Sequence, residues 1–134
     1  MEERRIPFRR HALALIGAAS LCGDVLACEL PPGVRLESER LALSYRTIPS
    51  KIAVGEHFVI VFGVCPKKTF NISEQLKVDA HMPEHRHGMN YRPGVAVLGA
   101  GRFRSEGWLF HMPGRWEFVF ELGAERLTDS VRIE

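Results

Sequence analysis

The stretch "EHFVIVFGVC", residues 56–65, is a nearly continuous apolar run of the kind that forms a central β-strand. Shorter runs on both sides of it are rich in apolar residues, most of them alternate with polar ones, and Gly, Pro and Asn separate them. These runs cover residues 40–47, 75–82, 94–100, 102–112, 115–122 and 126–134. About seven strands with turn residues at short intervals predict an all-β fold, an antiparallel β-sandwich of the immunoglobulin-like type. We expect residues 28–134 to form this single domain.

The first 27 residues have a different pattern. A basic opening contains Arg4, Arg5, Arg9 and Arg10, an apolar run covers residues 12–21, and the segment ends in Val25-Leu26-Ala27. This order is typical of a secretory signal peptide, so we expect a periplasmic or secreted protein that has no membrane span after cleavage. The apolar run is short for a bilayer span. An uncleaved anchor and a buried first helix are the alternatives.

Composition agrees with an ordinary globular domain. The 134 residues are 46% hydrophobic and 25% charged, and the formal net charge is +2. A balance this close to neutral offers no basic surface for nucleic acid or for an anionic membrane.

Two cysteines follow the predicted signal peptide. In an exported chain, Cys28 and Cys65 are most simply read as a disulfide, and its loop of about 37 residues would stabilise the fold by roughly 3–4 kcal/mol. The alternative is lipidation, because "VLAC" (25–28) is similar to a lipoprotein cleavage site with Cys28 as the acylated residue. Lipidation would leave Cys65 unpaired.

Histidine and methionine gather in two related segments, "HMPEHRHGM" (81–89) and "FHMPGRW" (110–116). All three methionines other than Met1 lie between residues 81 and 112, and so do four of the five histidines that follow residue 27. Imidazole binds copper, zinc and nickel, and a thioether sulfur adds a preference for Cu(I). The mixture therefore predicts a copper site rather than a zinc site.

Strand periodicity sorts these residues by direction. Met82 and Met112 share the parity of inward-facing residues, so His81 and His111 are expected to face solvent. The predicted loop after residue 82 could then bring further ligands over the same end of the sandwich. The predicted metal ligands are Met82, His85, His87, Met89 and Met112. Alternatively, the two strand methionines only fill the core and the loop histidines are solvated turn residues.

The sequence shows no recognisable catalytic or phosphate-binding motif. The chain shows neither a glycine-rich phosphate loop nor a Ser-His-Asp arrangement in a known context, so we expect no enzymatic activity. A second functional hypothesis needs no metal: an accessory module that docks on a membrane or secreted partner through the loop 83–92.

Two longer stretches, "DAHMPEHRHGMNYRP" (79–93) and "GRFRSEGWLFHMPGRWEFVFEL" (101–122), resemble YtkA-like and FixH-like domains of exported bacterial proteins. The matching positions are Met82, Pro83, His87, Gly88, Met89, Phe110, Met112, Gly114 and Trp116. The resemblance covers about residues 75–122. It implies a small immunoglobulin-like sandwich that handles copper, with a copper-accepting or respiratory assembly protein as partner. By motif position it implies Met82, His87, Met89 and Met112 as ligands, whereas His85 comes only from the residue pattern.

Overall fold

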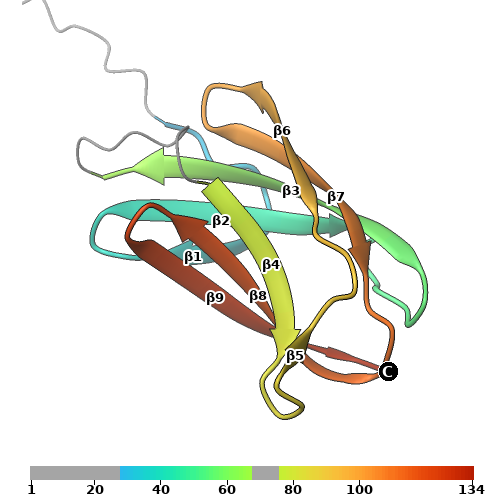
Figure 1. Ribbon diagram of the computed structural model, residues 1–134. Helices are drawn as coiled ribbons and strands as arrows, with labels where there is room; N and C mark the ends of the chain where they lie inside the picture. The colour runs from blue at the N-terminus through green and yellow to red at the C-terminus, as the bar shows by residue number, and fades with distance from the viewer. Residues whose placement is uncertain (1–27, 68–75) are drawn as a thin grey trace, which may run out of the picture.

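Two antiparallel sheets packed face to face make up residues 28–67 and 76–134, the part of the chain that the computed structural model describes (Figure 1). The first sheet has the strand order β1 (Val34–Glu37), β2 (Leu41–Ile48), β3 (His57–Pro66), β7 (Arg102–Leu109), β6 (Gly94–Gly99). The second has the order β5 (His87–Gly88), β4 (Leu76–Met82), β8 (Gly114–Leu122), β9 (Glu125–Ile133). The predicted signal peptide lies outside the described residues. Within them, no helix is long and apolar enough to cross a membrane.

Strand β3 is the centre of the first sheet, as its apolar run predicts. It pairs with β2 on one side and β7 on the other. Phe58, Ile60, Phe62 and Val64 are at most 3% exposed, and the residues between them are partly or fully buried. A strand paired on both edges and packed against a second sheet excludes water from nearly every position, which explains its continuous hydrophobicity.

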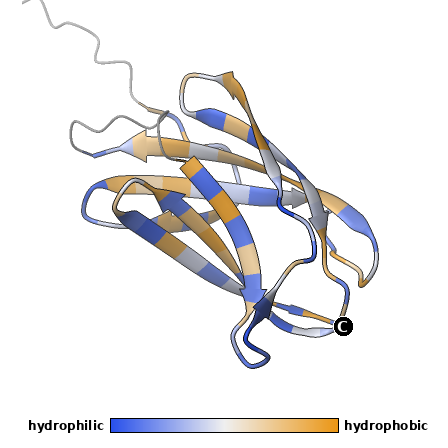
Figure 2. Ribbon diagram, in the orientation of Figure 1, coloured by the Kyte–Doolittle hydropathy of each residue, from blue (hydrophilic) through white to orange (hydrophobic). Residues whose placement is uncertain are grey.

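Aromatic rings from both sheets meet in the core. Tyr45 of β2 lies 5.4 Å from Phe118 of β8, and Phe62 of β3 lies 5.5 Å from Phe120, measured between ring centroids. Figure 2 shows the matching alternation of hydrophobic and hydrophilic residues along β4. Each fully buried ring of this size stabilises the fold by about 1.5–3 kcal/mol, so the core holds the two sheets together.

The seven predicted strands are confirmed, and two short strands were not predicted. These are β1 and β5, which lie at sheet edges. The run predicted over 102–112 ends as a strand at Leu109. Residues 110–112 do not continue the strand. The Phe110 carbonyl instead accepts a hydrogen bond from the Gly55 N–H at 2.8 Å, and the following Pro113 has no N–H for pairing with a neighbouring strand.

Cys28 and Cys65 form a disulfide, with Cα atoms 5.6 Å apart. This confirms the predicted disulfide. The bond ties the segment before β1 to the end of β3, across 37 residues of sequence.

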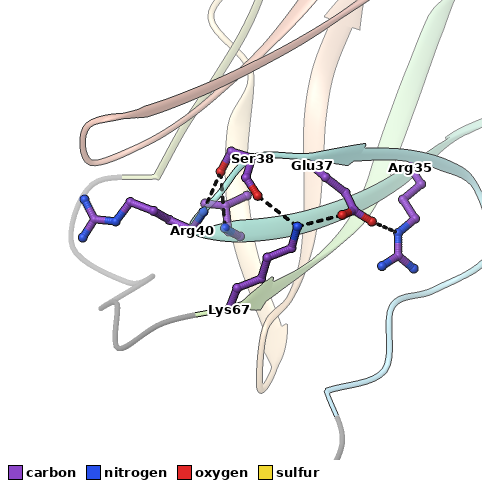
Figure 3. A network of polar contacts seen from close by, with 6 residues as sticks. Arg35, Glu37, Ser38, Arg40 and Lys67 are labelled. Carbon is purple, nitrogen blue, oxygen red and sulfur yellow. Dashed lines mark hydrogen bonds and ion pairs between the residues drawn. The ribbon is translucent and has the colours of Figure 1, made fainter.

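A network of polar contacts lies at the end of the first sheet that holds the disulfide (Figure 3). Lys67 donates hydrogen bonds to the Glu37 carboxylate at 2.7 Å and to the Ser38 carbonyl at 2.9 Å, and Arg35 donates to Glu37 at 2.5 Å. The hydrogen bond from Lys67, followed by the one from Arg35, lowers the pKa of the Glu37 carboxyl. The network is exposed, so it fixes the geometry of the β1–β2 turn more than it adds stability.

Tyr45 gives the fold a specific alkaline sensitivity. It is 4% exposed and its hydroxyl donates to the Asp129 carboxylate at 2.6 Å. Burial, followed by this hydrogen bond, raises the pKa of Tyr45 well above its usual range. The unfolded chain therefore loses this proton near pH ~10 while the folded chain keeps it, so stability falls as pH rises through the ordinary tyrosine pKa.

We expect Tyr45→Phe to reduce the loss of folding stability at alkaline pH. Above pH ~10 the slope of the unfolding free energy should become shallower by up to about 1.4 kcal/mol per pH unit. Urea denaturation from about pH 9 to about pH 11 measures it. Tyr91→Phe is the matched control, because Tyr91 is 57% exposed. Equal slopes in the wild type and Tyr45→Phe would contradict the expectation.

Candidate metal site

A tight hairpin replaces the loop that the sequence predicted after β4. Residues 83–86 reverse the chain, and the His85 N–H donates to the Met82 carbonyl at 3.2 Å. Arg86 has a φ of 54°, the left-handed conformation that such a reversal requires. His87 therefore lies in β5, opposite Met82 in the register of β4. The hairpin holds His85 and His87 at one end of the sandwich.

The second His-Met-Pro segment forms the connection between β7 and β8. The indole Nε1 of Trp116 donates to the Met112 carbonyl at 3.0 Å and so fixes this turn. Trp116 is completely buried and stacks on Phe110, with ring centroids 4.3 Å apart. The turn thus rests on two aromatic rings of the core.

The two His-Met-Pro segments meet at Met82 and Gly114. A Cβ atom added to Gly114 would lie 2.7 Å from Met82 Cε, so a glycine is needed for the methionine to pack there. Gly114 also has a φ of 129°. At the surface above, Arg115 of β8 donates to the Glu84 carboxylate at 3.1 Å and ties the hairpin to the second segment.

Three imidazole rings gather where the segments meet. The ring centroids of His85 and His87 are 5.8 Å apart and those of His87 and His111 are 5.2 Å apart. Trp116 lies beneath, 6.1 Å from His87 and 5.5 Å from His111. Two imidazoles that bind one ion through nitrogen at about 2.0–2.1 Å have centroids about 5 Å apart. We call His85, His87 and His111 the histidine cluster; in Figure 1 it belongs to the β5 turn and the adjacent β7–β8 connection.

The side chains of the cluster lie at the surface. His85 and His111 are exposed, and His87 is half-buried. The Nδ1 atom of His87 lies 3.2 Å from the Gly88 carbonyl oxygen, which can only accept a hydrogen bond. That bond assigns the proton to Nδ1 and leaves the Nε2 lone pair for a ligand. His81 differs, because its Nε2 lies 3.5 Å from the Glu117 carboxylate, away from the cluster.

The methionines lie at two depths. Met82 is 0% exposed and belongs to the core, as its parity predicts. Met89 and Met112 are partly buried and pack against the core from the same end of the sandwich. Met89 and Met112 therefore lie nearer the surface than Met82 does.

The structure brings together the predicted ligands His85 and His87 and adds His111, which sequence reasoning had set aside as solvent-facing. The repeated His-Met-Pro triplet was the signal that could have identified it. Within residues 28–67 and 76–134, no three or more His, Cys, Asp or Glu side chains are already positioned as a metal centre. Comparisons with protein-family models, curated proteins and solved structures find no match to this chain.

Proposed function

We propose that this protein is an exported copper carrier that binds Cu(I) at one end of an immunoglobulin-like β-sandwich of the YtkA-like or FixH-like type. In this proposal residues 1–27 are a signal peptide, the protein works in the periplasm, and it delivers copper to an acceptor or respiratory assembly protein without catalysing a reaction. The observation that carries the proposal is the contact of the His87 ring with those of His85 and His111, in the two segments that also hold the methionines.

The donor set supports copper over the other metals that histidine binds. Thioether sulfur favours Cu(I), whereas a structural zinc site usually recruits thiolates. The only two cysteines that follow residue 27 are consumed by the disulfide. The proposed ligands are His85 and His87 with Met82, Met89 and Met112, and we add His111 because its ring centroid lies 5.2 Å from that of His87. Of these ligands, His85 and His111 are exposed, and exposed ligands suit transfer to a partner because an acceptor's ligands can replace them one at a time.

Anaerobic Cu(I) titration of the exported protein tests the proposal. Copper at the cluster should quench the fluorescence of Trp116, whose ring lies 5.5 Å from His111. Replacing His85, His87 and His111 together by alanine should lower the Cu(I) affinity at least about a hundredfold, a loss of about 2.7 kcal/mol. Met89→Leu with Met112→Leu keeps the side-chain volume and should weaken Cu(I) more than Zn²⁺.

The chain provides a matched control in its other histidines. His57→Ala and His81→Ala remove imidazoles that contact the Trp108 carbonyl and the Glu117 carboxylate instead of the cluster. Both variants should bind Cu(I) as the wild type does. Equal Cu(I) affinity in the cluster variant and in these controls would reject the metal site.

The exposed loop favours a second candidate function. Tyr91 is 57% exposed within the segment 83–92, and an exposed aromatic ring is a common anchor in protein interfaces. In this alternative the protein is an accessory module that docks on a membrane or secreted partner and binds no metal. Absence of copper uptake, together with capture of a partner that Tyr91→Ala abolishes, would select it.

A further inference from the structure

The four sheet edges of the described residues differ in charge. An exposed strand edge can pair with another chain, and proteins usually protect such edges with charged residues or very short strands. The edge strands β1 and β9 both carry charges, and the remaining edge of the second sheet combines the two-residue β5 with a charged β4. The charged residues are Arg35, Glu37, Lys77, Asp79, Glu125, Arg126, Asp129 and Arg132. Strand β6, "GVAVLG", has no charged residue (Figure 2).

Strand β6 also carries apolar side chains that are exposed in the described part of the chain. In the register with β7, Val95 and Val97 lie opposite Ser105 and Phe103, which are buried in the core. Residues opposite each other in an antiparallel pair point to the same face of the sheet. Yet Val95 is 37% exposed and Val97 is 69% exposed. Val95 lines a hollow with residues 76–79 of β4, and Val97 lies largely in solvent.

The backbone of β6 is regular over most of its length. Its pairing with β7 is continuous from Gly94 to Val97, and the register shift comes only between Val97 and Gly99. The nearest charge in the next strand, on Arg104, is neutralised by Glu106 at 2.6 Å. Residues 94–97 therefore present an unprotected, uncharged edge.

We propose that β6 pairs antiparallel with β6 of a second copy of this chain, so that the first sheets of two molecules join into one. A two-fold axis places a strand next to itself in the antiparallel direction, and a strand without charges meets no repulsion from its own copy. The pairing satisfies the free N–H and C=O groups of the edge and lets Val95 and Val97 of each copy cover those of the other. The opposite edge of this sheet, β1, is charged, so the assembly closes at two copies.

The proposed dimer is weak and leaves the histidine cluster open. Four paired residues span about 13 Å, and such an interface is smaller than those of permanent dimers. In Figure 1, β6 reaches the top of the view while the β5 turn lies at the bottom. The dimer therefore does not depend on the proposed copper function, and copper binding is expected to be equal in monomer and dimer.

Sedimentation equilibrium of the exported protein across micromolar to millimolar concentrations tests the proposal. The average mass should rise with concentration and level off at twice the monomer mass. Val97→Lys should weaken the dimer at least about tenfold, because each interface then buries two ammonium groups. Val34→Lys is the matched control: Val34 is a 46% exposed valine on β1, at the other edge of the same sheet, and this variant should dimerise as the wild type does.

Circular dichroism and thermal unfolding show that both variants remain folded. A wild type that stays monomeric at its highest soluble concentration overturns the proposal. So does a mass that grows past the dimer without limit, or an equal loss of association in Val97→Lys and Val34→Lys.

Discussion

Replacing Trp116 by alanine is expected to lower the free energy of unfolding by about 3–5 kcal/mol. Trp116 is 0% exposed and its ring stacks on Phe110 at 4.3 Å, so its removal leaves a large cavity between the sheets. The same ring contacts His87 and His111, so the cluster loses its support as well. Urea denaturation followed by circular dichroism measures the change in stability.

Trp116→Phe separates the packing from the hydrogen bond. A phenyl ring can still stack on Phe110, but it has no N–H for the Met112 carbonyl. We expect a loss of about 1–3 kcal/mol, smaller than the loss for alanine. If Trp116→Ala cost less than about 1 kcal/mol, Trp116 would not be the support of the cluster that its contacts indicate.

Removing the disulfide is expected to have a similarly large effect. Replacing Cys28 and Cys65 together by alanine should lower the unfolding free energy by about 4 kcal/mol, because the bond closes a loop of 37 residues in the unfolded chain. Denaturation of the wild type with and without reductant gives an independent measure of the same quantity.

The effect should depend on the bond and not on either side chain. Cys28→Ala alone should cost about as much as the double replacement, because Cys28 itself is exposed. The double variant should show no further loss when reductant is added. Unchanged stability in the double variant would mean that the bond does not constrain the unfolded chain.

Residue pattern alone predicted the strands that bury a face. The alternation around Met82 placed that side chain inside, where it is 0% exposed, and the apolar run around Ile60 identified the central strand. The pattern could not predict β1 or β5. Edge strands pair on one side only and, when short, carry too few buried residues to produce a periodic signal.

The candidate site was only partly predictable for a related reason. Parity correctly directed His111 toward solvent, but an exposed side chain can still touch another exposed side chain. Its contact with His87 depends on the hairpin turn at Arg86. The left-handed backbone of this turn was not predictable, because Arg86 stands where a glycine would be the usual sequence signal. Distances between residues on different sheets follow from the packing of the two layers, which a one-dimensional pattern does not contain.

The sulfur chemistry of this chain is divided between the two ends of β3. Cys65 lies near its last residue, while its first residue, His57, pairs with Leu109, two positions before His111. Eight residue steps of strand, about 26 Å, separate Cys65 of the disulfide from His57 at the other end of β3. Because neither cysteine is among the proposed ligands, reduction of the disulfide would remove no ligand from a metal held by the cluster. The disulfide and the proposed metal site would therefore act independently, at opposite ends of one small domain.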